Sequence, residues 1–148
     1  MKTMGFALLL VPVMAFADQG AVPETELSLG GVAIGDSTEA VVARLGQPKR
    51  KGPAQDFIDL HYEYPHMRVS FNGGIVAGLH AGKAGACTPK GLCPGDRMDR
   101  MRALYGAPIV SDRETGRYYE YTGGDAACWL QIRSRGKRVA SIDVACQP

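Results

Sequence analysis

The sequence predicts an α+β protein of two tandem repeats, each a short helical segment packed on a three-stranded antiparallel sheet. Gly31, Gly35, Asp36, Gly46 and Pro48 each recur sixty positions later, since 91 − 31 = 60 and the other offsets are equal. Each copy of this pattern is followed by apolar and polar residues that alternate with the period of a β-strand. Such an internal repeat indicates two similar structural units.

The amino-terminal residues predict a secretory signal peptide over residues 1–17. Lys2 precedes an apolar run, and Ala15 and Ala17 form the small-residue pattern of a cleavage site. The run is interrupted by Pro12 and is too short for a bilayer core, which needs about 20 residues. No cysteine follows the cleavage point. We therefore expect a periplasmic or secreted protein with no lipid anchor and no stable membrane insertion, beginning with a polar amino-terminal tail over residues 18–26.

The first predicted repeat spans residues 27–80 and begins with a helix. Asp36 is a candidate amino-terminal cap with Glu39 three residues later, and Gly46 and Pro48 end the helix. Alternating residues then predict strands over 58–64, 67–71 and 75–79, joined at the last hairpin by a Gly-rich turn. On this alternation, the residues expected to share the apolar face of the last hairpin are Met67, Val69, Phe71, Ile75, Ala77 and Leu79.

The second predicted repeat spans residues 92–148 and follows a Gly- and Ala-rich linker over residues 81–91. Asp96 and Asp99 take the places of the acidic residues at the helix start. In the last hairpin, pairing Ile132 with Ile142 places Cys128 opposite Cys146 on the same face. Register and face agree, so this hairpin predicts its own disulfide.

The four cysteines predict two disulfides, because an even number in an exported chain is typical of disulfide bonding. Cys128 with Cys146 is the preferred pair, which leaves Cys87 and Cys93 to close a tight local loop. Four cysteines allow three connectivities, so cross-pairing stays open. Neither pair has the two-residue spacing of a zinc knuckle, and we predict no metal site.

Charge and motifs argue against several classes of function. Residues 18–80 carry 5 basic and 8 acidic side chains, a net charge of −3, and residues 81–148 carry 11 and 7, a net charge of +4. This balance is too weak to predict a nucleic-acid partner. The glycine-rich stretches lack the order of a P-loop, and no serine has the GxSxG context of a hydrolase. We predict no cofactor and no catalytic residue.

The polar faces of the predicted strands supply the candidate binding residues. If Cys128, Leu130 and Ile132 face the helix, Trp129, Gln131 and Arg133 point to the open face of the sheet. Trp and Arg are enriched at interface hot spots. An equal alternative is that Trp129 covers a neighbouring edge or packs under a loop. The full set of predicted binding residues is Trp129, Arg133, Gln131, Tyr118, His61 and Arg68.

The stretch GDSTEAVVARLGQP, followed by YEY, RVSF and IVAGL, resembles the helix-and-strand unit of the SmpA/OmlA (BamE) family. In tandem and with two local disulfides, the chain is also similar to β-lactamase inhibitory protein. The resemblance covers residues 27–79 and 92–144. It differs from the family pattern at Asp36, where the family has Met, and in having no lipoprotein cysteine. It implies a sheet whose open side binds another protein, although a fold does not fix a function.

These observations together predict an exported, non-catalytic protein-binding module of the bacterial cell envelope, acting as a scaffold or assembly factor. The partner expected is another envelope or secreted protein. One alternative is an inhibitor of a secreted or periplasmic enzyme. Another is a small ligand-binding protein or enzyme that uses a pocket between the repeats.

Overall fold

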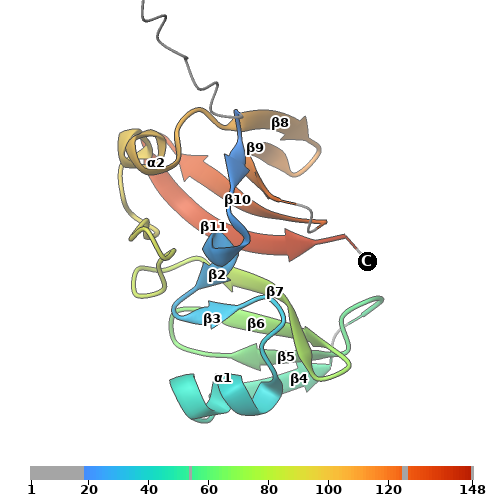
Figure 1. The fold of residues 1–148 in the computed structure, drawn as a ribbon. Helices are drawn as coiled ribbons and strands as arrows, with labels where there is room; N and C mark the ends of the chain where they lie inside the picture. The colour runs from blue at the N-terminus through green and yellow to red at the C-terminus, as the bar shows by residue number, and fades with distance from the viewer. Residues whose placement is uncertain (1–18, 54, 125–126, 148) are drawn as a thin grey trace, which may run out of the picture.

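One continuous mixed sheet of nine strands runs through the whole fold (Figure 1). The computed structural model describes residues 19–53, 55–124 and 127–147, so the predicted signal peptide lies outside the described residues. Along the sheet the strand order is β1-β9-β10-β11-β7-β6-β5-β4, and β8 also pairs with β9. A separate two-stranded sheet joins β2 and β3.

The chain forms its elements in two groups, each a helix followed by four strands. The segment before the first helix holds β1 (Ala21–Val22), a 3₁₀ helix (Glu24–Glu26), β2 (Ser28–Leu29) and β3 (Val32–Ala33). The first half of the fold is α1 (Thr38–Leu45), β4 (Arg50–Pro53), β5 (Leu60–Glu63), β6 (Arg68–Asn72) and β7 (Ile75–Ala81). The second half is α2 (Met98–Tyr105), β8 (Ile109–Arg113), β9 (Gly116–Gly123), β10 (Cys128–Arg135) and β11 (Arg138–Cys146).

The two halves join edge to edge where β7 pairs with β11. This seam is antiparallel and places Gly78 opposite Ala145, Leu79 opposite Val144, His80 opposite Asp143 and Ala81 opposite Ile142. β1 adds to the outer edge of β9 in parallel, which makes the sheet mixed. The segment predicted as a polar tail thus contributes a strand to the sheet, and Glu26 at its end is buried.

The predicted fold class is therefore wrong. Of the residues that the structure describes, 46% are in strands and 15% in helices, and nine of the strands form one sheet rather than two separate three-stranded sheets, each with its own helix. The alternation correctly marked most strands, but it carries no information about which edge strands meet. β4 and β8 also escaped prediction, because Arg50–Pro53 and Ile109–Arg113 show little alternation.

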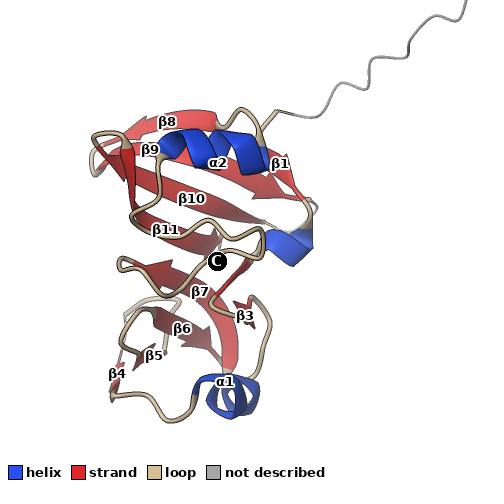
Figure 2. Cartoon of the chain, turned by 90° about the vertical axis from the view of Figure 1, so that its left-hand side faces the viewer, coloured by secondary structure: helices blue, strands red, loops and turns tan. Residues whose placement is uncertain are grey.

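Both helices cover the same face of this sheet, and Figure 2 shows α2 lying across β9 and β10 with α1 at the opposite end of the molecule. Val41 of α1 and Met101 of α2 are fully buried in a single core cluster with the inward residues of the strands. Helices of two turns are unstable alone, so this packing holds them in place. The core residues from the two central strands of each half are Val69, Phe71, Val76, Leu79, Ala81, Cys128, Leu130, Ile132, Val139, Ile142 and Val144.

Each half contains a β-bulge that shifts the alternation of its last hairpin. The register changes between Ser70 and Phe71 in one hairpin and between Arg133 and Ser134 in the other. As a result Val76 is buried and Ile75 is 45% exposed, so the predicted inward face of Ile75 and Ala77 is wrong. A bulge inserts one unpaired residue and so moves the residues beyond it to the opposite face.

The helix starts differ in one respect from the prediction. Ser37, not Asp36, caps α1 by accepting a hydrogen bond from the Ala40 amide at 3.1 Å. The Asp36 carboxylate instead accepts from the Ala33 amide at 2.9 Å and so closes the turn before the helix. α2 has Arg97 at its cap position, with no side-chain hydrogen bond to the helix.

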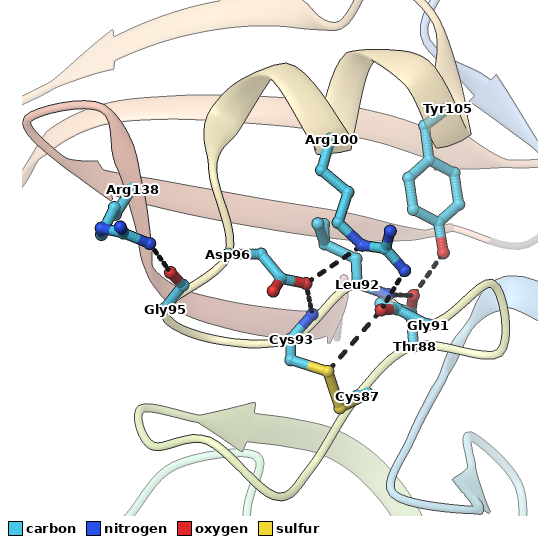
Figure 3. Close-up of polar contacts among 10 residues, drawn as sticks. All are labelled: Cys87, Thr88, Gly91, Leu92, Cys93, Gly95, Asp96, Arg100, Tyr105 and Arg138. Atoms are coloured by element: carbon cyan, nitrogen blue, oxygen red, sulfur yellow. Dashed lines mark hydrogen bonds and ion pairs between the residues drawn. A yellow bond between two sulfur atoms is a disulfide. The ribbon is translucent and has the colours of Figure 1, made fainter.

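Both predicted disulfides are confirmed. Cys128 bonds to Cys146 across the last hairpin, in the predicted register, and Cys87 bonds to Cys93. Figure 3 shows the second bond at the turn before α2, where the Asp96 carboxylate accepts from the Cys93 amide at 2.8 Å. The disulfide thus links the chain that leaves the seam to the start of the second helix.

Candidate functional site

The face of the sheet opposite the helices is polar and crosses the seam without interruption. Antiparallel partners lie on the same face, so the pairings place Gln131, Asp143, His80, Arg68 and Glu63 in one row across five strands. The neighbouring row contains Trp129, Ala145, Gly78, Ser70 and His61. Neither α1 nor α2 packs on this face, because both belong to the core on the other side.

A groove of about 510 Å³ lies on this open face at the seam. Its floor is low because Ser70, Gly78 and Ala145 are adjacent across three strands and have small side chains. The loop before β5 forms one wall, where Phe57 is 40% exposed. The polar residues that line the groove, on the sheet and on this loop, are Gln55, Asp56, His61, Arg68, Ser70, His80, Gln131 and Asp143.

Four of the polar side chains that the sheet contributes to the groove, His61, Ser70, His80 and Asp143, are paired with one another, and Arg68 is paired with Glu63. His61 Nδ1 and Ser70 Oγ are 2.9 Å apart, and Arg68 Nε donates to Glu63 at 2.5 Å. The third pair, His80 with Asp143, crosses the seam. Because such bonds fix the rotamers of both partners, the groove presents a preorganised set of donors and acceptors.

That third pair is His80 with Asp143, whose Nδ1 and Oδ1 atoms are 2.6 Å apart. The hydrogen bond to Asp143 raises the pKa of His80 above its ordinary value, and partial burial opposes this increase. Arg68 lowers and Glu63 raises the same pKa by smaller amounts. The seam is therefore joined on its open face by an ion pair that strengthens as the pH falls toward neutrality and below.

The structure separates the predicted binding residues into two groups. His61 and Arg68 line the groove together with Gln131. Gln131 is nevertheless only 8% exposed, and its amide donates to the Glu120 carboxylate at 2.8 Å. Tyr118 and Arg133 lie together on the second half, with the Arg133 guanidinium carbon 5.4 Å from the Tyr118 ring centre.

Trp129 lies between the two predicted alternatives. It is half-buried, and its indole Nε1 is buried without a hydrogen-bond partner among the described residues. Its position opposite Thr122 and Ala145 places it on the open face, as the alternation predicts. It does not line the groove.

Sequence reasoning missed the contribution of His80 and Gly78 to the site. Both residues act through the pairing of β7 with β11, which brings together positions that are more than sixty residues apart. No local signal in the sequence marks that pairing. Over residues 19–53, 55–124 and 127–147, no three His, Cys, Asp or Glu side chains form a metal-binding group, and no helix is long and apolar enough to span a bilayer.

Comparison with protein-family profiles and with curated protein sequences finds no match. Solved structures with the same fold include a cysteine-rich secretory protein from Staphylococcus aureus, with a TM-score of 0.59 and 14% identity, and an extracellular protein containing an SCP domain from Bacillus anthracis, with 0.57 and 10%. The alignments cover 87% and 94% of this chain but only 49% and 50% of those proteins. This chain therefore spans about half the length of each.

A DUF4309 family protein from Bacillus subtilis is also similar, with a TM-score of 0.51 and 14% identity, over 86% of this chain and 88% of that one. At these identities the similarity concerns the fold alone. The neighbours are SCP-domain and DUF4309 proteins and not members of the SmpA/OmlA (BamE) family or β-lactamase inhibitory protein, so the predicted resemblance is wrong. The fold is shared with a protein of nearly the same length and with part of two larger extracellular proteins.

Proposed function

We propose that the chain is an exported, non-catalytic protein-binding module of the bacterial cell envelope, which holds a segment of a partner protein in the groove at the seam. The observation that supports this most strongly is the groove itself, a hollow of about 510 Å³ with a floor of small residues on a sheet face that both helices leave uncovered. A scaffold or assembly role needs only this rigid surface.

The chemistry of the groove suits a polypeptide segment. Exposed Phe57 offers an apolar contact on one wall, and Arg68 and Asp143, paired with Glu63 and His80, add groups of opposite charge beside the floor. Protein interfaces combine apolar contacts with about one hydrogen bond per 100–200 Å². The paired side chains are already ordered, so binding costs less side-chain entropy.

Export is supported by two further observations. Two of the structural neighbours are described as secretory or extracellular proteins. All four cysteines form disulfides, which persist in oxidising compartments. Both agree with the signal peptide predicted over residues 1–17.

A substitution that fills the groove tests the proposal. Gly78→Val places a side chain on the floor, where a Cβ would have only ordinary contacts of 3.6 Å or more. Gly52→Val is the matched control, since Gly52 lies on β4 outside the groove and a Cβ there meets nothing within 4 Å. Each mature protein is used to capture partners from a periplasmic extract, and the bound proteins are identified by mass spectrometry.

We expect the wild-type protein and Gly52→Val to capture the same partner saturably, and Gly78→Val to lose it while unfolding at nearly the same temperature. Arg68→Ala, compared with Arg50→Ala outside the groove, should weaken capture in the same direction. Equal capture by Gly78→Val and Gly52→Val would contradict the proposal. If the captured partner is an enzyme that loses its activity in the complex, the chain is an inhibitor rather than a scaffold.

The second candidate is a small-ligand-binding protein or an enzyme. The volume of the groove favours it, because ligand pockets occupy about 300–1,000 Å³. The contact of His61 with Ser70 is the geometry of a base and a hydroxyl, although general-base catalysis also needs a substrate pose that the fold alone does not define. A small molecule that protects the folded protein against heating, together with no captured protein, would support this candidate instead.

A further inference from the structure

Basic side chains gather at one end of the second half, away from the groove. The Arg133 guanidinium donates to the Thr115 carbonyl at 2.7 Å, which places the β8–β9 and β10–β11 turns side by side. The Met98 amide donates to the Lys137 carbonyl at 2.9 Å, which brings the start of α2 to the same place. We name this surface the basic end and define it as Arg97, Arg102, Arg113, Arg117, Arg133, Arg135, Lys137 and Arg138.

More than half of these cations have no acidic partner. Arg97 pairs with Asp99, Arg113 with Glu120, and Arg117 with Asp112. The remaining five form no ion pair in the part of the chain that the structure describes, and all five are exposed; they are Arg102, Arg133, Arg135, Lys137 and Arg138. The basic end therefore carries positive charge that the fold does not neutralise.

A hollow of about 290 Å³ lies within the basic end, between the first turn of α2 and the β10–β11 turn. Three of its lining residues are Arg97, Arg102 and Lys137, and its only carboxylate, Asp99, is already paired with Arg97. Arg102 also lies 5.9 Å from the ring centre of Tyr119 at the same hollow. Arg102 and Lys137 thus remain to bind one phosphate group. The surrounding arginines of the basic end remain to bind adjacent phosphate groups.

We propose that the basic end binds the anionic phospholipid headgroups of a membrane surface, with one phosphate in the hollow. The charges extend from two turns and a helix end, which suits a surface of many phosphates. None of the exposed large hydrophobic residues of the described chain lies in the basic end, so binding is electrostatic and does not involve insertion. The proposal goes beyond the protein-binding function of the groove, since the two surfaces share no residue.

Sedimentation with lipid vesicles tests this proposal. The mature protein is mixed with vesicles of phosphatidylcholine alone, or with vesicles in which about a third of the lipid is anionic phosphatidylglycerol. Both are tested at low and at high salt. The variant Arg135→Gln with Lys137→Gln removes two cations that form no ion pair in the described structure. The matched control, Lys49→Gln with Arg50→Gln, removes two exposed cations near the opposite edge of the sheet.

We expect binding to the anionic vesicles only, weakened by salt because the charges are exposed. The Arg135 and Lys137 variant should bind about 25-fold more weakly, since each cation near an anionic membrane contributes about a fivefold change in affinity. The control variant should bind within about twofold of the wild type. No binding to anionic vesicles, or equal loss in the two variants, would overturn the proposal. Binding to acidic polypeptides but not to vesicles would also overturn it, in favour of a protein partner.

Discussion

The turns before α1 and α2 have the same hydrogen bonds but different surroundings. In each turn an aspartate accepts from the backbone amide three residues earlier, Asp36 from Ala33 and Asp96 from Cys93. In each turn the backbone also pairs with the last hairpin of its own half. The second turn is in addition linked by the Cys87–Cys93 disulfide, whereas the first is not.

The hairpins that meet these turns also differ in charge. The first hairpin turns at Asn72, Gly73, Gly74 and Ile75, and the second at Arg135, Gly136, Lys137 and Arg138. The backbone arrangement is alike, but only the turn of the second hairpin carries cations. The aspartates that the two turns share therefore account for the local backbone geometry. The hairpin-turn residues that differ account for the different surface charge of the two halves.

The largest effect should come from the covalent links. Replacing both Cys128 and Cys146 with serine should lower the free energy of unfolding by about 3 kcal/mol, because this disulfide closes a loop with a sequence separation of 18. Replacing Cys87 and Cys93 should cost about 2 kcal/mol, since the separation is 6. Urea unfolding of the two variants measures the difference, and the reverse order would show that loop length does not control it.

A smaller difference in the free energy of unfolding should distinguish Asp36 from Asp96. Asp36→Ala should cost about 2 kcal/mol, because it leaves the Ala33 amide without its acceptor. Asp96→Ala should cost only about 1 kcal/mol, since the disulfide still holds Cys93 in place. When both disulfide cysteines of this turn are serine, the Asp96 cost should rise to match that of Asp36. Asp36→Asn and Asp96→Asn keep an acceptor oxygen and serve as controls in chemical unfolding.

The stability contributions of Tyr64 and Tyr121, which bond to the ends of the two helices, should differ by less. Tyr64 donates to the Gly46 carbonyl at 3.0 Å and Tyr121 to the Gly106 carbonyl at 2.8 Å, but only Tyr121 is fully buried. Burial raises the pKa of Tyr121 to about 12. Tyr121→Phe should cost about 1 kcal/mol and Tyr64→Phe less.

The raised pKa of Tyr121 also predicts a dependence on alkaline pH. Its contribution is fully present below pH 10, where the unfolded side chain is protonated, and is lost as the pH rises through about 12. Thermal unfolding between pH 9 and pH 12 should therefore show a steeper loss of stability in the wild type than in Tyr121→Phe. Parallel curves for the two proteins would contradict the burial of this hydroxyl.

The smallest effect concerns the ion pair across the seam. The pKa of His80 is raised, so the stability it contributes is full below about pH 6.5 and is lost as the pH rises through the folded value. Both side chains are partly exposed, and we expect less than about 1 kcal/mol. Asp143→Asn should flatten the stability curve between pH 6 and pH 8. A steeper curve in that variant would assign the pH dependence to another group.

Local pairing could be predicted from the sequence, and distant pairing could not. The register of β10 with β11 and the Cys128–Cys146 bond followed from alternation within one hairpin, and both are confirmed. The seam follows no such pattern, because β7 and β11 lie more than sixty residues apart and each has a suitable neighbour in its own half. Two tandem sheets were therefore predicted where one sheet exists.

The candidate site shows the same division. His61 and Arg68 were placed on the open face because alternation assigns faces within a strand. His80, whose strand pairs across the seam, and the hollow above Gly78 depend on that distant pairing. Gln131 is on the predicted face but buried, and its partner Glu120 lies on the next strand. Alternation gives the direction of a side chain and not what covers it.

Native-state hydrogen exchange at the seam tests most directly whether the two halves form a single sheet. The relevant amides are those within Gly78–Ala81 and Ile142–Ala145 that point across the seam, because the alternate amides of these segments face β6 and β10 in their own halves. We expect the hydrogen-bonded amides of both segments to exchange only through global unfolding, at the same free energy as the centre of β10. Exchange of both segments through a lower-energy opening, with each half still protected, would show that the halves fold as separate sheets and that the groove is not a fixed surface.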